Sequence, residues 1–427
     1  MRPGTMRVAV GSTLLGLSLA IPQFFTAADA CPRHDKDTRF YVPEPNPAAL
    51  AQIADLKASH NRADAKLIKI MIETPQAVWF TGGTPREVRK DVREIVHRAN
   101  KQDAIPVLVA YNLPYRDCSQ YSAGGAANAQ EYMAWIDGFA AGIGHQKAIV
   151  ILEPDGLGII PWYKQFRGLD SQADDYEWCQ PADADPTTVA DDRFAMLNYA
   201  VDALKAHAEV TVYLDGTHSG WLGSGDAAHR LVQAGVERAD GFFLNVSNYQ
   251  PTDHLQKYGT WTAKCIWFGT QSADWSRGHF DWCASQYYPA KADDFSTWTD
   301  SDQWYTDNVE SQDYAGYPGD AGLKQFVIDT SRNGQGPWTP ATGYPDNQDW
   351  CNPPARGLGF APTTNTGVLL NEAFLWVKIP GESDGQCNRG TGGTTDPARG
   401  DIEDPAAGLW FPEMALELVH NANPPLR

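Results

Sequence analysis

A succession of short apolar runs, rich in Val and Ile and bounded by turn residues, most constrains the fold of this 427-residue chain. Runs of this length are typical of strands that are buried on both faces of a sheet. Seven of them follow one another: IKIMIET, AIPVLVAYNLP, AIVILEPD, EVTVYLDGTH, GFFLNVSNY, QFVIDTS and AFLWVKIPG. Amphipathic helical patterns lie between them, namely REVRKDVREIVHRAN, AQEYMAWIDGFAAGI and RFAMLNYAVDALKAHA. This alternation predicts an α/β chain with a parallel sheet.

Polar residues recur at or shortly after the ends of these runs. They are Asp117, Asp155, Asp215, Asn248, Asp329 and Asp384. In a β/α barrel the carboxyl ends of the strands converge on one face, where the loops build the active site. The pattern therefore predicts a cleft lined by carboxylates.

The charge balance excludes some classes of partner. The chain carries a formal net charge of -19, which repels phosphate backbones and anionic lipid, so we expect neither nucleic acid nor a membrane surface as partner. A neutral substrate fits better. Aromatic residues make up 11% of the chain, and exposed aromatic rings can stack on the flat apolar faces of sugars.

The first 30 residues are typical of a secretory signal peptide. Arg2 and Arg7 supply a basic start, VAVGSTLLGLSLA is an apolar segment too short to span a membrane comfortably, and Ala28-Asp29-Ala30 forms a cleavage site. We expect an extracellular protein that begins near Cys31. An uncleaved anchor is the alternative.

The rest of the chain, residues 31–427, is expected to form one catalytic domain without an appended binding module, because it contains no internal repeat and no long linker. The tryptophan-rich stretch from Gln250 to Ala321 is interpreted as an insertion held by its own disulfide, with its tryptophans used for packing. The stretch from Gly385 to Gly408 is rich in Gly, Asp and Pro and is expected to be an ordered surface loop.

The chain has seven cysteines, at positions Cys31, Cys118, Cys179, Cys265, Cys283, Cys351 and Cys387. In an oxidising compartment they would form up to three disulfides and leave one thiol. A zinc site is disfavoured, because the chain lacks C-x-x-C and H-x-x-x-H spacings.

Two long segments, VAYNLPYRDCSQYSAGG (109–125) and VILEPDGLG (150–158), resemble the two signatures of glycoside hydrolase family 6 cellulases. Further similarity runs in the family's order through YLDGTHSGWLG, LNVSNYQ, DTSRNG, DWCNP and WVKIPGESDG. The resemblance implies a distorted, seven-stranded, TIM-like parallel β/α barrel with long loops that cover the cleft. It also implies hydrolysis of β-1,4-glucan, such as cellulose, with inversion at the anomeric carbon. We expect a monomer without cofactor or metal.

The resemblance assigns the general acid to Asp155. A carboxyl group at a strand end that is partly desolvated and near other carboxylates has a raised pKa, as an acid that must stay protonated requires. Asp117 matches the neighbouring aspartate that keeps this acid protonated and supports the transition state. Glu153 is expected to form structural hydrogen bonds inside the barrel. The alternatives are a capping or turn role for Asp155 and an ion pair with Arg116 for Asp117.

The resemblance places the candidate base at Asp384, acting directly or through a relay of waters. An inverting enzyme needs its two carboxyl groups about 6.5–9.5 Å apart, so that a water molecule fits. Asp215 matches another aspartate of the cleft, with a turn role that holds Thr217 or His218 as its alternative.

Substrate contacts are carried over residue by residue. The matching positions are the aromatic platforms Trp79, Trp221 and Trp350, the tyrosine Tyr111 beneath the distorted sugar ring, and the polar residues His218, Lys378 and Glu382. Two departures stand out. Ala123 replaces a serine linked to placement of the water, with Ser122 one position earlier, and Ser224 follows SGWLG where some members that attack chain ends have tryptophan.

The resemblance also implies two disulfides, Cys118–Cys179 and Cys351–Cys387. A third, Cys265–Cys283, is inferred only from the remaining cysteines, and Cys31 would be the odd thiol.

The long loop after Asp384 and the Gln250 insertion favour a covered cleft and the release of cellobiose from chain ends. An endoglucanase is the close alternative. Two other classes are a non-catalytic glycan binder on the same scaffold and a retaining glycosidase, whose carboxyl groups would lie only about 5–5.5 Å apart.

Overall fold

A computed structural model describes residues 38–166, 176–311, 316–340 and 343–426. The predicted signal peptide, with its cleavage site, and Cys31 lie outside these residues. Among the described residues, the helices are all too short or too polar to cross a membrane.

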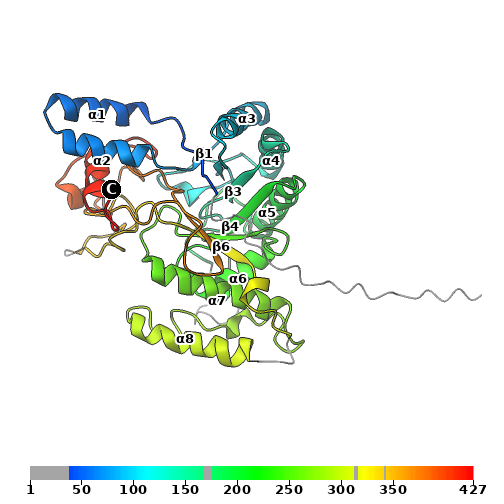
Figure 1. The fold of residues 1–427 in the computed structure, drawn as a ribbon. Coiled ribbons are helices and arrows are strands. Elements are labelled where there is room, and N and C mark those ends of the chain that lie inside the picture. Colours follow the sequence, from blue (N-terminus) through cyan, green and yellow to red (C-terminus); the bar gives the residue numbers. More distant parts are fainter. Residues whose placement is uncertain (1–37, 167–175, 312–315, 341–342, 427) are drawn as a thin grey trace, which may run out of the picture. The chain divides into compact units, whose positions relative to one another are not determined.

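Seven parallel strands form one sheet in the order in which they occur along the chain (Figure 1). They are β1 (Val78–Phe80), β2 (Val107–Ala110), β3 (Ala148–Leu152), β4 (Val210–Asp215), β5 (Gly241–Leu244), β6 (Gln325–Asp329) and β7 (Asn371–Leu375). The sheet curls, so that the chain near its first and last strands meets again: Ala77 N donates to Trp376 O at 2.9 Å. This arrangement confirms the expected seven-stranded distorted barrel.

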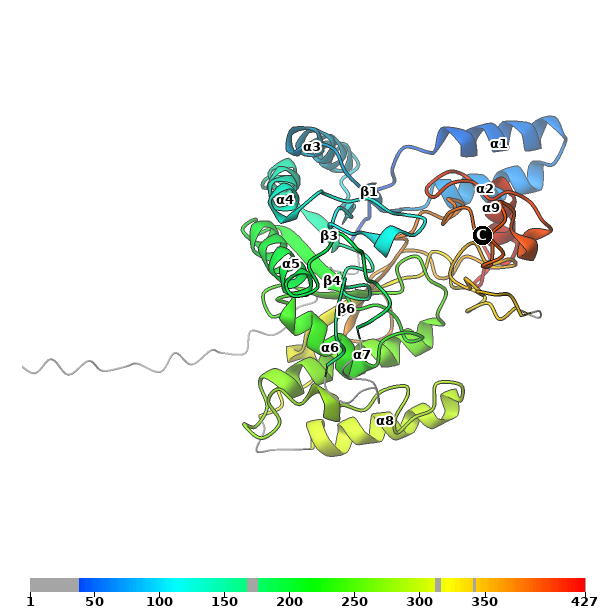
Figure 2. The same ribbon diagram turned by 180° about the vertical axis from the view of Figure 1, so that it is seen from behind.

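The helices that connect the strands cover the outside of the sheet (Figures 1 and 2). They are α3 (Pro85–Lys101), α4 (Ala129–Ile143), α5 (Val189–Lys205), α6 (Ser224–Gln233) and α7 (Thr252–Thr270). A second group of helices packs together beside the barrel: α1 (Pro47–Ala58), α2 (Arg62–Ile72) and α9 (Pro412–His420). The helix α8 is Trp298–Tyr305, and the short helical turns are η1 (Asp117–Ser119), η2 (Phe280–Trp282), η3 (Phe295–Thr297), η4 (Thr306–Glu310), η6 (Asp320–Gly322) and η7 (Pro397–Arg399).

Alternate residues of each strand enter two different cores. In β2, Val107 and Val109 belong to the cluster inside the barrel, whereas Leu108 and Ala110 pack against the surrounding helices. Both sets are buried, which explains why β2 is apolar throughout rather than at every second residue.

The prediction of a strand at IKIMIET is wrong, because these residues belong to the end of α2 and the turn after it. The buried residues Ala65, Ile68, Met71 and Ile72 recur at spacings of three and four residues, as on one face of a helix. Asn61 caps the helix by accepting a hydrogen bond from Asp64 N. The first strand is instead the three-residue segment VWF in β1.

The Gln250–Ala321 stretch is only partly an insertion. Its first part is α7, which lies between β5 and β6 in the chain and packs on β6. The remainder folds over α6 and α7 and is fastened by the disulfide Cys265–Cys283, as expected. Its tryptophans differ from the prediction in part, since Trp261 and Trp298 are buried but Trp275 and Trp282 are about half exposed.

The Gly385–Gly408 stretch is ordered, but it is not merely a surface loop. Arg389 and Asp396 form an ion pair in which both side chains are fully buried. Arg389 also donates to Gln348 O. Because an unpaired charge would be costly at such a position, these bonds fix the loop against the barrel.

Candidate active site

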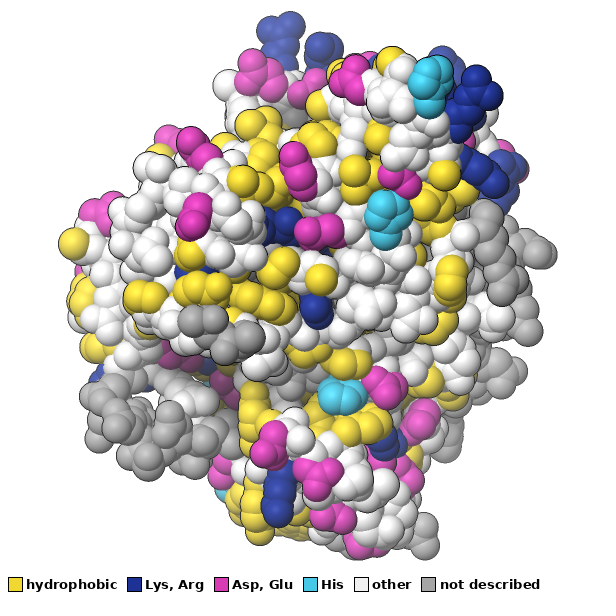
Figure 3. Space-filling view, turned by 90° about the vertical axis from the view of Figure 1, so that its left-hand side faces the viewer, with side chains coloured by type: hydrophobic (Ala, Val, Ile, Leu, Met, Phe, Trp, Pro, Cys, Tyr) yellow, Lys and Arg dark blue, Asp and Glu magenta, His cyan; other side chains and the backbone are white. Residues whose placement is uncertain are grey.

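A cavity of about 780 Å³ opens at the carboxyl ends of the strands. Of the six polar residues at the strand ends, it is lined by Asp117, Asp155, Asn248 and Asp384. The other two, Asp215 and Asp329, are buried beneath it and accept hydrogen bonds from loop backbone. On the face shown in Figure 3, acidic and basic side chains are interspersed with hydrophobic patches.

Asp155 follows β3 in a left-handed backbone conformation with φ of 61°. Burial raises the pKa of its carboxyl group well above the ordinary range, and the nearby Asp215, Asp117 and Asp384 add to the effect. The capping alternative does not hold, because the residues after Asp155 form turns and the next helix in the described chain begins at Val189. Asp155 does lie in a turn, but it also lines the cavity. The site therefore presents a carboxyl group whose protonated form is favoured by its surroundings.

Asp117 lies on η1 and lines the same cavity. Burial raises its pKa to about 6, although a hydrogen bond from Ser122 N (2.7 Å) and the charge of Arg116 oppose the rise. Arg116 is not an ion-pair partner: its guanidinium donates to the carbonyls of Thr81 and Tyr111. It thereby holds the backbone of the loop that carries Asp117.

Asp384 has the opposite electrostatic character. Burial acts to raise its pKa, but the charges of Arg332 and Lys378 together with hydrogen bonds outweigh burial and lower it. Its Oδ2 accepts from Arg332 (2.8 Å), Tyr249 (3.3 Å) and Asn352 N (3.0 Å), and its Oδ1 lies 3.3 Å from Lys378 Nζ. Asp384 is therefore an ionised carboxylate and a weak base.

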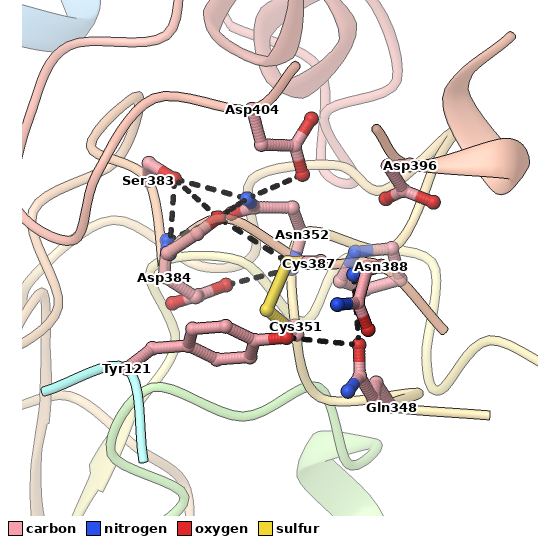
Figure 4. The surroundings of a disulfide bond; sticks show 12 residues. Tyr121, Gln348, Cys351, Asn352, Ser383, Asp384, Cys387, Asn388, Asp396 and Asp404 are labelled. Atoms are coloured by element: carbon pink, nitrogen blue, oxygen red, sulfur yellow. Dashed lines mark hydrogen bonds between the residues drawn. A yellow bond between two sulfur atoms is a disulfide. The ribbon is translucent and has the colours of Figure 1, made fainter. Parts of the chain in front are cut away.

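The disulfide Cys351–Cys387 lies next to these contacts (Figure 4). Asn352, adjacent to the disulfide, exchanges two hydrogen bonds with Asp384 and donates through Nδ2 to Asp404 at 2.9 Å. Cys118–Cys179 similarly fixes the residue after Asp117. All three expected disulfides are thus formed, and two of them fasten segments that carry cleft carboxylates.

Asp215 supports the site from below. Its Oδ2 accepts from Leu157 N (3.1 Å) and Gly158 N (3.2 Å), and its Oδ1 accepts from Thr217 N (2.9 Å). Burial raises its pKa to about 6. Asp215 is 4% exposed and does not line the cavity, which favours the turn role over direct contact with substrate.

Glu153 is buried inside the barrel and forms structural hydrogen bonds, as expected. Its carboxylate accepts from Asn112 N (2.8 Å) and Leu113 N (3.1 Å), the residues that follow Tyr111. Burial raises its pKa to about 7.

The substrate-binding candidates other than Asp215 all line the cavity: Trp79, Tyr111, His218, Trp221, Trp350, Lys378 and Glu382. Trp79 and Tyr111 pack edge to face with ring centroids 5.4 Å apart. A side chain on Gly158 would bring its Cβ to 2.4 Å from the Trp221 ring, so glycine there lets the ring lie on the backbone.

His218 lies in the cleft as a neutral side chain. Burial lowers its pKa to about 3. Because its Nδ1 accepts from Gly220 N at 3.1 Å, its proton resides on Nε2 and is available to a ligand.

Several cleft residues were not singled out from the sequence. They are Tyr121, Trp178, Ser247, Tyr249 and Gln250 on the cavity wall, with Arg332 and Asn352 behind it. Tyr121 lies in the first signature segment and Arg332 in DTSRNG, so the family-like segments contained the signal for both. Ser224, by contrast, is fully buried and donates to Ala284 O.

Among the described residues, the group that could hold a metal ion comprises Cys387, Asp396 and Asp404. It does not fit one, because Cys387 is in a disulfide and Asp396 is paired with Arg389.

A cleft at the mouth of a parallel barrel, lined by aromatic rings and by one carboxyl group with a raised pKa and another with a lowered pKa, has the features of a glycoside hydrolase. The chain belongs to the glycosyl hydrolases family 6, whose model matches residues 35–422.

Individual relatives agree with this assignment. Endoglucanase 1 of Streptomyces halstedii is 32% identical over 414 residues, which cover 96% of this chain and 98% of the relative. A probable 1,4-beta-D-glucan cellobiohydrolase C of Neosartorya fischeri is 27% identical and covers 82% of this chain and 70% of the relative.

Among solved structures, the endoglucanase Cel6 from Mycobacterium tuberculosis, in complex with a methyl-cellobiosyl-4-deoxy-4-thio-beta-D-cellobioside, is 31% identical. It has a TM-score of 0.62 and covers 90% of this chain and 97% of that chain. Cellobiohydrolase II (Cel6A) from Humicola insolens, at 21% identity and a TM-score of 0.60 over 91% of this chain and 98% of that chain, shows likeness of fold alone.

Proposed function

We propose that the protein is an inverting β-1,4-glucanase that hydrolyses cellulose. The observation that carries the proposal is the contrast between two cleft carboxyl groups, Asp155 with a raised pKa and Asp384 with a lowered one. An inverting enzyme needs one group that gives a proton to the leaving oxygen and another that stays ionised and draws a proton from water.

In this mechanism, Asp155 donates its proton to the glycosidic oxygen as the bond to the anomeric carbon breaks. Positive charge develops on the sugar ring, and the carboxylate of Asp117 stabilises it. Tyr111 lies beneath that ring, beside Asp155 and Asp117, and burial raises the pKa of its phenol well above the usual range. The phenol therefore stays protonated and neutral.

The attacking water enters from the face opposite the leaving group and loses its proton toward Asp384. Lys378 and Arg332 hold the carboxylate of Asp384 and weaken it as a base, so we propose that the proton passes through a second water rather than directly. Ala123 and Ser122 both line the cavity near Asp117, and the Ser122 hydroxyl is our candidate to replace the serine that the family often has at position 123.

The aromatic residues of the cleft hold successive glucose rings. Trp79, Trp350 and Trp221 offer flat apolar faces, while Lys378 and Glu382 offer a cation and a carboxyl group to the sugar hydroxyls. The bound polymer is neutral, in keeping with a chain whose net charge is -19.

The sequence alone favours cellobiose release, but we propose cleavage within chains as the main action. Endoglucanases are the relatives at 30–32% identity, whereas the cellobiohydrolases are 27–28% identical. The buried Ser224 leaves no further platform beyond Trp221 at that position. Release from chain ends stays as second candidate, because Tyr121 contacts Trp350 and Gln348 across the cleft.

Two measurements test these proposals. Proton NMR of the first product from cellohexaose should show the α-anomer; the β-anomer would indicate retention, and no turnover at all would favour the glycan binder. On insoluble cellulose, an endoglucanase leaves a large share of new reducing ends in the solid, whereas release from chain ends places nearly all of them in solution.

We also propose that the protein is secreted and acts as a monomer. The three disulfides support an oxidising compartment. N-terminal sequencing of the exported protein should give a start near Cys31, and a start at Met1 would contradict cleavage. Light scattering of the purified protein should give the molar mass of a single chain, and twice that mass would contradict the monomer.

A further inference from the structure

We propose that Trp178 is a second aromatic platform for glucose rings on the leaving-group side of the cleft, an inference that rests on the function proposed above. Trp178 lines the cavity together with Asp155 and Trp221. Its side chain is 55% exposed, so the ring contributes little to the core and is open to a ligand.

The backbone on both sides of Trp178 is fixed. Glu177 pairs with the buried Arg230, and its N–H donates to Tyr163 O at 2.9 Å. On the other side, Cys179 is bonded to Cys118, and its carbonyl accepts from Trp162 N at 2.8 Å. The backbone that carries the exposed ring is therefore held on both sides, which lowers the entropy lost when a ligand binds to it.

We infer the side of the cleft from the loop after Asp155. Residues 156–163 directly follow the proposed proton donor in the chain, so the group that receives the proton would lie beside them. The ring of Trp221 lies on Gly158 of this loop, and the segment that carries Trp178 is bonded to its other end at Trp162 and Tyr163. Both tryptophans thus flank the same loop.

Other exposed tryptophans of the described chain differ in their position. Trp275 and Trp282 are 50% and 45% exposed, but they stack on each other, and Trp282 also stacks on His279. Neither lines the cavity. Trp282 is therefore a matched control: an exposed tryptophan of similar accessibility outside the cleft.

The test compares two substrates in the Trp178→Ala and Trp282→Ala variants. Cellohexaose places glucose rings on both sides of the bond that is cut, whereas β-cellobiosyl fluoride has none on the leaving-group side. For each variant, kcat/KM is measured by product chromatography for cellohexaose and with a fluoride electrode for the fluoride, and the ratio of the two values is compared with that of the unaltered enzyme.

We expect Trp178→Ala to lower the ratio by about fivefold to tenfold, mainly through a higher KM for cellohexaose, as truncation of an aromatic anchor commonly does. Trp178→Phe should restore part of it, and Trp282→Ala should leave it unchanged. A ratio that stays the same, or equal losses on both substrates, would overturn the inference. If the unaltered enzyme cleaved neither substrate, the proposed function itself would fail.

Discussion

Replacement of Asp155 by alanine should lower the rate most on substrates whose leaving group must be protonated to depart. General acid catalysis contributes about 10²–10⁴ in rate, and the neighbouring carboxyl groups are engaged in other bonds. Asp215 already accepts three backbone hydrogen bonds, and Asp117 accepts one from Ser122. We therefore expect kcat on cellohexaose to fall by about 10³–10⁴, equivalent to roughly 4–5.5 kcal/mol of barrier.

The same variant should keep most of its activity on 2,4-dinitrophenyl cellobioside, because dinitrophenolate departs without protonation. We expect a loss of less than about tenfold there. Initial rates on both substrates measure the effect, and Asp300→Ala, which removes an exposed carboxylate on α8, serves as the control. Equal losses on the two substrates would refute the assignment of the proton donor.

Three further predictions follow from particular contacts. Asp117→Asn should move the alkaline limb of the kcat profile to lower pH, because the charge of Asp117 helps raise the pKa of Asp155. The Asp117 carboxyl group, with a pKa of about 6 in the folded protein and about 4 in the unfolded chain, destabilises the fold as pH rises through this range. Between pH 3.5 and 7.5 the free energy of unfolding of the variant should therefore rise by up to about 3 kcal/mol relative to that of the unaltered enzyme, measured by thermal unfolding. Gly158→Ala should displace the Trp221 ring, raise KM for cellohexaose and cost about 1–3 kcal/mol of stability; an unchanged KM would contradict the packing. The double variant Cys351→Ser/Cys387→Ser should lose about 4 kcal/mol of stability in urea unfolding, and a loss below about 1 kcal/mol would show that the bridge adds little.

The strands β2 to β7 could be predicted because each lies in or overlaps a run rich in apolar residues. The three residues of β1 are too few to show a pattern. The strand was predicted instead at the more apolar IKIMI, whose residues form part of one face of the helix α2. Local periodicity identifies long helices and strands well, but it identifies very short ones poorly.

The carboxyl groups that line the cleft could be predicted through the family-like segments, and so could the raised pKa of Asp155, but the lowered pKa of Asp384 could not. The pKa of Asp384 depends on Arg332, which lies 52 residues away in the chain. Asp215 stands at a strand end like Asp155, and only the turn of the 156–158 backbone toward its oxygens separates their environments. Such differences arise from the three-dimensional path of loops.

Because the first and last strands meet, Trp79 has two roles, one in the cleft and one in closing the barrel. Close to the backbone bond from Ala77 to Trp376, its indole N–H donates to Val377 O at 2.8 Å. The side chain proposed to bind a sugar thus also joins the two edges of the barrel by a hydrogen bond. Weaker polymer binding after truncation of Trp79 would therefore combine the loss of ring stacking with a loosened barrel wall. Phenylalanine at this position would remove the hydrogen bond to Val377 but keep an aromatic ring.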